Sequence, residues 1–176
     1  MDPARLGSQI VWMKTTTQPG KARSGFWQFH VSDFAVGNTK IEACGSVGCQ
    51  AVADSSATSI GLPPAIHSLI SEQANVRSDC SGFEELPLVG VEIDGYILNL
   101  RPQDYVFRSA DGGSCRSAFY PMNIPPPKGP IVMLGVPFLT AFYSIYDRES
   151  LKIGLALAAH KDVELEDSAK LFVQLP

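Results

Sequence analysis

A single acidic residue at the end of a short apolar segment is the residue of this chain best suited to chemistry. Asp54 follows the apolar residues 51–53 and precedes a run of small hydroxyl residues. A carboxylate at the end of a buried strand is costly unless hydrogen bonds stabilise it, so such a group usually has a function. The hydroxyls and amides of Ser55, Ser56 and Thr58 are suitable donors. The segment therefore predicts a hydrogen-bonded carboxylate on a loop at a strand end.

Two other kinds of chemistry are disfavoured by the surroundings of the candidate residues. Ser55 and Ser56 lack the G-x-S-x-G pattern that surrounds a serine nucleophile, so neither is expected to attack a substrate. The histidines His30, His67 and His160 do not have the spacing of metal ligands. We therefore expect no metal site and no cofactor.

The four cysteines are compatible with two arrangements. An even number fits either two disulfides or one metal site. Cys44 and Cys49 are too widely spaced for a zinc knuckle, and Cys80 and Cys115 each stand alone in the sequence. The spacing by itself leaves both arrangements open.

The bulk properties predict one folded globular domain. The chain has 176 residues, of which 45% are hydrophobic, and its net charge is −4. The absence of Lys/Arg clusters argues against binding to a nucleic-acid backbone. The longest apolar stretch, residues 131–146, contains Gly135 and Pro137 and is too short to span a bilayer, so we expect no membrane segment.

Strands are predicted on both sides of Asp54. Residues 26–36 are β-rich, and residues 39–43 follow a Gly-Asn turn as a hairpin partner. A helix is expected to start near Pro63-Pro64, with its apolar stripe at Ile66, Leu69 and Ile70.

Further strands are predicted in the second half of the chain. Asp94-Gly95 between alternating apolar runs indicates a hairpin, and residues 131–134 form an apolar strand that ends at Gly135. A short helix at 137–141 and strands at 143–146 and 151–156 follow. Many short strands with few helices indicate an all-β fold.

The segments around Asp54 and Gly135 resemble, in this order, the C-terminal lobe of a pepsin-like aspartic protease. In that family the first segment reads hydrophobic-hydrophobic-Asp-Thr/Ser-Gly-Thr/Ser and the second reads hydrophobic-Leu-Gly, and the second passes through the loop of the first. Further matches in order are residues 25–29, Cys44 to Cys49, Phe138-Leu139, 146–148 and 152–156.

The resemblance implies a fold and a division of the chain. We expect a pepsin-like acid protease lobe, with closed or packed sheets like a six-stranded barrel and a few short helices. Residues 1–24 would be a lead-in with the first strand, 25–160 the lobe, and 161–176 a charged and then apolar tail.

The resemblance also implies a disulfide pairing and a location. The cysteines would pair as Cys44–Cys49 and Cys80–Cys115, which implies an oxidising compartment in the secretory pathway, the vacuole or the extracellular space. The first five residues lack the apolar core of a signal peptide. We therefore expect the chain to be part of a longer protein whose upstream half carries the signal and the other lobe.

The resemblance implies that Asp54 is the catalytic aspartate of a peptide-hydrolysing site. Such a site needs a second acid, and no second Asp-Thr/Ser-Gly occurs in the sequence. The second acid is therefore expected from an N-terminal lobe missing from this chain, and the isolated chain is expected to be inactive. A second copy of the chain is a less favoured source. The substrate would be an extended peptide between the lobes.

The active-site loop departs from the family pattern at two positions. Ser55 matches a Thr/Ser that ties the loops of the two lobes together, and Gly135 is intact. Ser56 replaces a glycine, and its side chain is expected to crowd the partner acid or change the backbone angle. Ala57 replaces a hydroxyl residue that hydrogen-bonds the carboxylate, so the pKa of Asp54 is expected to rise. Val136 stands where many relatives carry Asp.

Two functions follow from these matches and departures. The first is one lobe of an aspartic endopeptidase, with Asp54 as half of its pair of acids. The second is an inactive pseudoprotease lobe that serves as a binding or structural module, which the changes at Ser56 and Ala57 favour.

Overall fold

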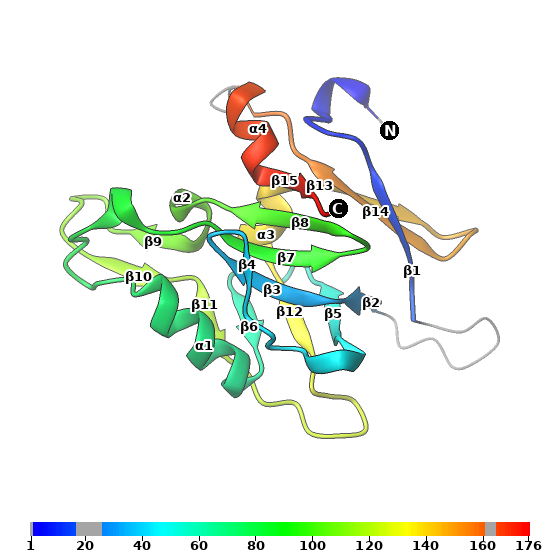
Figure 1. Cartoon of the computed structure of the whole chain (residues 1–176), viewed down its shortest axis with the longest axis horizontal. Coiled ribbons are helices and arrows are strands. Elements are labelled where there is room, and N and C mark those ends of the chain that lie inside the picture. The colour runs from blue at the N-terminus through cyan, green and yellow to red at the C-terminus, as the bar shows by residue number, and fades with distance from the viewer. Residues whose placement is uncertain (1, 17–25, 161–164) are drawn as a thin grey trace.

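The computed structural model describes residues 2–16, 26–160 and 165–176, and the predicted lead-in and tail therefore lie partly outside the described residues. The described chain is mostly β-strand, arranged in four sheets with a few short helices (Figure 1). The prediction of an all-β pepsin-like lobe is confirmed.

One five-stranded sheet, called the mixed sheet here, contains both parallel and antiparallel pairs. In spatial order it consists of β11 (Phe119–Pro121), β6 (Ile60–Leu62), β12 (Val132–Leu134), β5 (Cys49–Ala53) and β2 (Trp27–Val31). The pairs β11/β6 and β12/β5 are parallel, and β12/β6 and β2/β5 are antiparallel. Strands from distant parts of the sequence therefore meet in this sheet.

The other five-stranded sheet, called the antiparallel sheet here, is built largely from hairpins. It consists of β15 (Phe172–Gln174), β8 (Tyr96–Leu100), β7 (Val89–Ile93), β3 (Asp33–Val36) and β4 (Thr39–Lys40). The predicted turns at Gly37-Asn38 and Asp94-Gly95 join β3 to β4 and β7 to β8, and all of these residues have positive φ.

Two smaller sheets and the helices complete the fold. β1 (Val11–Lys14), β14 (Lys152–Leu157) and β13 (Phe142–Asp147) form one sheet, and β10 (Cys115–Ser117) with β9 (Val106–Arg108) forms the other. The α-helices are α1 (Pro64–Ala74), α2 (Pro102–Tyr105), α3 (Val136–Ala141) and α4 (Leu165–Leu171), with 3-10 turns at Pro3–Arg5, Gly45–Val47 and Phe83–Glu85. No described helix has the length and apolar character needed to cross a membrane.

The sheets share one hydrophobic core. Fully buried aromatic and aliphatic side chains from the mixed sheet, the antiparallel sheet, α3 and β13 belong to it: Phe29, Phe34, Leu98, Leu134, Phe138 and Phe142. Tyr105 is also buried, and its hydroxyl donates to the Pro87 carbonyl at 2.6 Å. Burial raises the pKa of this phenol, which keeps it a neutral donor.

The β-rich segment at residues 26–36 forms two strands in different sheets. β2 pairs with β5 in the mixed sheet, and β3 pairs with β7 in the antiparallel sheet. Ser32 lies between β2 and β3, and its N–H donates to the Glu92 carbonyl at 2.8 Å. Alternation of residue types predicts β structure here, but it does not reveal where the chain changes sheets or which partner each half pairs with.

The predicted helix is confirmed, but its apolar stripe is partly wrong. Ile66 and Ile70 are buried in α1, as expected, whereas Leu69 is 38% exposed. Ala74, one turn beyond Ile70, is buried instead. The buried face of α1 therefore consists of Ile66, Ile70 and Ala74, and it is narrower than the apolar stripe predicted from the sequence.

The C-terminal segment adds a helix and an edge strand. β15 pairs with β8 so that Phe172 lies opposite Leu98, and the rings of Phe172 and Tyr96 are 5.2 Å apart. Leu171 at the end of α4 is 3% exposed. The Asn99 amide donates to the Lys170 carbonyl at 2.7 Å, so a buried side chain fixes the helix end to the sheet.

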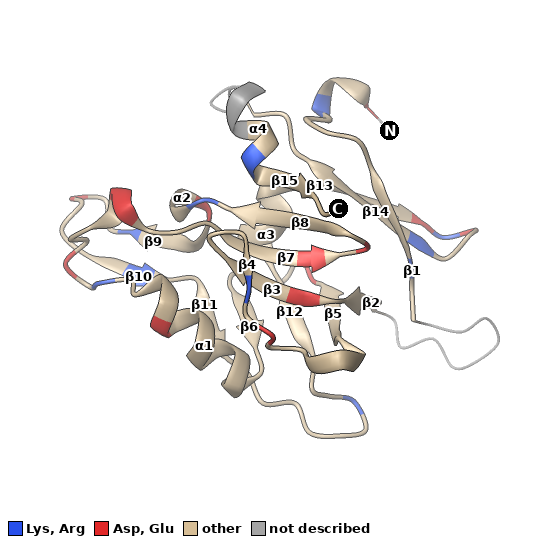
Figure 2. Ribbon diagram, viewed as in Figure 1, with Lys and Arg blue, Asp and Glu red and all other residues tan. Residues whose placement is uncertain are grey.

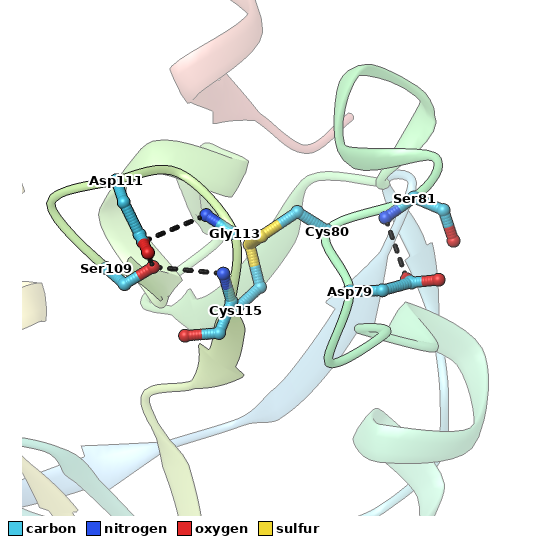
Figure 3. The surroundings of a disulfide bond; sticks show 8 residues. Asp79, Cys80, Ser81, Ser109, Asp111, Gly113 and Cys115 are labelled. Atoms are coloured by element: carbon cyan, nitrogen blue, oxygen red, sulfur yellow. Dashed lines mark hydrogen bonds between the residues drawn. A yellow bond between two sulfur atoms is a disulfide. The ribbon is translucent and has the colours of Figure 1, made fainter.

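The two disulfides have the pairing that the family resemblance implied. Cys44–Cys49 closes the turn before β5, and Cys80–Cys115 joins the loop after α1 to β10. Figure 3 shows the second disulfide between two tight turns. In one turn Asp79 accepts from the Ser81 N–H at 3.0 Å, and in the other Asp111 accepts from the Gly113 N–H at 3.1 Å. The disulfide therefore links two hydrogen-bonded turns that are distant in sequence.

Two carboxylates are buried in the antiparallel sheet, where β3, β4 and β7 carry acidic and basic segments (Figure 2). Glu92 accepts from the Lys40 ammonium at 2.8 Å. Asp33, its register partner, accepts from the backbone N–H groups of Ala43 and Cys44 at 2.8 and 3.2 Å. Each buried charge thus has a partner, as burial requires.

Candidate functional site

Asp54 lies at the end of β5, on the loop that connects β5 to β6. β12 lies between these two strands in the sheet, parallel to β5 and antiparallel to β6. The strand that ends at Gly135 therefore passes between the two arms of the Asp54 loop. The sequence predicted this crossing only through the family resemblance, because nothing local links residues about 80 positions apart.

Backbone hydrogen bonds hold the loop to β12 and to the start of α3. The Asp54 N–H donates to the Leu134 carbonyl at 3.0 Å, and the Val136 N–H donates to the Ala57 carbonyl at 2.8 Å. A Cβ at Gly135 would lie 2.2 Å from the Ser59 carbonyl oxygen and 2.4 Å from the Ala57 carbonyl oxygen. Only a glycine fits at this crossing.

The Asp54 carboxylate is partly exposed and is tied through one of its oxygens. Oδ1 accepts a hydrogen bond from the Ser56 hydroxyl at 2.7 Å and another from the Ser56 N–H at 2.9 Å. The hydroxyl bond first, and the N–H bond second, hold the pKa of Asp54 below its ordinary value of 3.8. The site thus presents an ionised carboxylate at mildly acidic pH.

One expectation for this loop is wrong. The pKa of Asp54 does not rise in the absence of a hydroxyl at Ala57, because the Ser56 hydroxyl supplies a donor. Ser56 is not among the described residues with positive φ, so its Cβ causes no backbone strain of that kind. Crowding of a partner acid by Ser56 stays a prediction.

The remaining predicted loop residues gather around the same crossing. Ser55 is exposed, and Ala57 is partly buried and accepts a hydrogen bond from the Val136 N–H through its carbonyl oxygen. Gly135 lies where β12 comes closest to the backbone of the Asp54 loop. Val136 is 43% exposed at the first turn of α3. The structure thus brings together Asp54, Ser55, Ser56, Ala57 and Gly135, whereas the four cysteines form the two disulfides described above.

A row of side chains beside the loop was not singled out from the sequence. Gly61 of β6 lies opposite Tyr120 of β11 and Met133 of β12. The Tyr120 hydroxyl is 3.7 Å from the Met133 sulfur, and a Cβ at Gly61 would lie 2.9 Å from that hydroxyl. A glycine inside a strand is a signal of such close packing.

The described residues carry no cluster of three or more histidine, cysteine, aspartate or glutamate side chains that could hold a metal ion. Three ion pairs are formed in the described parts of the chain, Arg5–Asp2, Lys40–Glu92 and Arg101–Asp104, and Asp54 belongs to none of them.

Curated relatives of this chain are cathepsins. Cathepsin E-A of Xenopus laevis is 33% identical over 162 residues, which cover 88% of this chain and 38% of that protein. Cathepsin D of Clupea harengus is 31% identical over 144 residues (76% and 36%), and cathepsin D of Bos taurus is 33% identical over 147 residues (78% and 37%). The chain thus spans less than two fifths of the length of these relatives.

The family model of the eukaryotic aspartyl proteases matches residues 1–158, which is most of the chain. The match includes β5, the Asp54 loop and the β12 strand that passes through it. The chain therefore belongs to the eukaryotic aspartyl protease family.

Proposed function

We propose that this chain is the C-terminal lobe of a two-lobed aspartic endopeptidase and that Asp54 is one of its two catalytic acids. The observation that carries the proposal is the position of Asp54: a partly exposed carboxylate at the strand crossing, held through Oδ1 by Ser56. No hydrogen bond to Oδ2 is formed among the described residues.

The chemistry needs a second carboxyl group close to Oδ2. Two carboxyl groups about 3 Å apart do not both ionise, so they share one proton. The charged carboxylate removes a proton from water as the water oxygen bonds to the peptide carbonyl carbon, and the protonated acid donates its proton to the carbonyl oxygen. When this tetrahedral intermediate collapses, the C–N bond breaks, the acid that took the proton from water gives it to the leaving nitrogen, and the other carboxylate takes back a proton from a hydroxyl of the intermediate, which regenerates the pair.

The second acid is proposed to come from another lobe of the same precursor. The support is the length of the relatives, of which this chain covers 38% in the cathepsin E-A match. The substrate is proposed to be an extended peptide, and the disulfides Cys44–Cys49 and Cys80–Cys115 favour a secretory, vacuolar or extracellular location.

The test is the Asp54→Asn variant of the full-length protein. We expect cleavage of an unfolded protein at acidic pH, inhibition by pepstatin, and a loss of about 100-fold or more in kcat/KM in the variant. Asp79→Asn is the matched control, because Asp79 accepts from Ser81 in a similar Asp-x-Ser turn that lies outside the site. Activity that survives Asp54→Asn would refute the assignment.

A pseudoprotease lobe is the second candidate, and the replacement of the family residues at Ser56 and Ala57 favours it. It predicts a folded full-length protein without cleavage, in which Ser56→Gly combined with Ala57→Thr restores activity. A homodimer that supplies Asp54 twice predicts cleavage by the isolated chain and sedimentation as a dimer at micromolar concentration. A strictly monomeric chain excludes the homodimer.

A further inference from the structure

The Ser56 side chain contacts Asp54 in a way that the family pattern does not predict. Its hydroxyl and its N–H both donate to Oδ1, at 2.7 and 2.9 Å, and the residue is otherwise exposed. Two donors from one residue restrict rotation of the carboxylate, because Oδ1 stays fixed only in one orientation of the group. Hydrogen bonds to the charged form of an acid also stabilise that form.

In the described part of the chain, the elements that flank the loop provide no other ionisable side chain near Asp54. β12 (Val132–Leu134), β6 (Ile60–Leu62) and α3 (Val136–Ala141) contain no acidic, basic or histidine residue. In β2, His30 pairs with Gln50 at the opposite end of β5 from Asp54, and its ring contacts the Val47 carbonyl at 3.1 Å. Among the described residues, hydrogen bonds from Ser56 are the main influence on the charge of this carboxylate.

We propose that Ser56 is the positioning residue of this site, and that it fixes Oδ1 so that Oδ2 of Asp54 is the oxygen presented to the second acid. This proposal rests on the proposed function. Ser56 does the work of the hydroxyl that is missing at Ala57, from one residue earlier in the loop. The two Ser56 donors stabilise the charged form of Asp54, which is the form that a base needs.

The first test is the titration of the Asp54 carboxyl carbon by NMR in the 176-residue chain. Ser56→Ala removes the hydroxyl and keeps the N–H, so the Asp54 midpoint is expected to move upward. Ser56→Thr keeps a hydroxyl and is expected to retain the low midpoint. Ser56→Gly with Ala57→Thr moves the hydroxyl to the family position and is expected to restore it.

Asp79 supplies an internal control in the same spectra. It accepts from the Ser81 N–H at 3.0 Å, and hydrogen bonds from Ser81 lower its pKa. Ser81→Ala should move the Asp79 midpoint and leave the Asp54 midpoint in place. Ser56→Ala should move the Asp54 midpoint and leave the Asp79 midpoint in place. A Ser56→Ala variant in which Asp54 does not move overturns the proposal, and so does a Ser56→Thr variant with a raised Asp54 midpoint.

The second test separates this inference from the proposed function. In the full-length enzyme, Ser56→Ala should shift the acidic limb of the kcat/KM profile to higher pH with little change in KM, and Ser56→Thr should reverse the shift. A pH profile unchanged by Ser56→Ala overturns the positioning role while leaving endopeptidase function intact. Absence of Asp54-dependent cleavage refutes the proposed function, and the NMR titration still decides whether Ser56 controls Asp54.

Discussion

The two five-stranded sheets are held together in different ways. In the mixed sheet, β12 pairs with β5 from about 80 residues away and passes through the loop that carries Asp54. In the antiparallel sheet, β3/β4 and β7/β8 are hairpins joined by short turns, whereas the β3/β7 and β15/β8 pairs join distant parts of the chain. Backbone groups in the mixed sheet therefore meet with little free space, whereas the turns of the antiparallel sheet lie open to solvent. The difference predicts where the same substitution is tolerated.

The largest expected effect comes from adding one methyl group at the crossing. Gly135→Ala would place a Cβ within 2.2 Å of a backbone carbonyl, so we expect a loss of about 5 kcal/mol or more in the free energy of unfolding. In the β7–β8 turn, the Cβ added by Gly95→Ala would have no atom within 4 Å. The only cost is the positive φ of +80° at this residue, which should lower the free energy of unfolding by about 1 kcal/mol. Chemical denaturation of both variants measures the contrast. Similar losses would contradict the proposed difference between the sheets.

The disulfides repeat the contrast between long-range and local links. Replacing Cys80 and Cys115 by Ser opens a link between residues 35 apart, and replacing Cys44 and Cys49 opens one between residues 5 apart. Loop-closure entropy predicts losses of about 4 and about 2 kcal/mol in the free energy of unfolding. Denaturation in non-reducing buffer measures both. A larger loss for the shorter loop would show that local geometry, and not chain entropy, dominates.

β15 joins the antiparallel sheet from the far end of the described chain, and Leu171, the last residue of α4 directly before β15, tests the contribution of this C-terminal segment. Leu171 is 3% exposed, so Leu171→Ala should lower the free energy of unfolding by about 3 kcal/mol. Leu69→Ala on α1, where the side chain is 38% exposed, is the control and should lower it by less than about 1 kcal/mol. Equal effects would mean that the C-terminal segment contributes little to the sheet.

The smallest expected effect is on how the free energy of unfolding depends on pH in acid. Hydrogen bonds, chiefly from Ser56, Ser81, Ser109 and Ser150, lower the pKa values of Asp54, Asp79, Asp111 and Asp147 below their ordinary 3.8. A lowered folded-state pKa gives stability that is fully present above the ordinary pKa and is lost as pH falls through the lowered value. The free energy of unfolding should therefore decline below about pH 3.8, and less steeply in Ser56→Ala. Stability that increases below that pH would contradict this.

The local parts of the fold follow from the sequence. The sequence predicted two hairpin turns, at Gly37-Asn38 and Asp94-Gly95, together with the strands that they join. It also predicted that α1 starts at a proline pair. These features could be predicted because the residues that determine them are neighbours in the chain. The passage of β12 through the loop that carries Asp54 was predicted only from the family resemblance. The catalytic role of Asp54 and the division of the chain into lead-in, lobe and tail stay predictions.

Residue types along the chain determined the short strands, their turns and the presence of one carboxylate on a small-residue loop. Only the tertiary structure decided that residues 26–36 divide between two sheets at Ser32, that β15 pairs with β8, and that the Ser56 hydroxyl contacts Asp54. The physical reason is common to the three cases. A strand partner or a hydroxyl rotamer depends on which groups the rest of the fold brings within hydrogen-bond distance, and local sequence does not encode that distance.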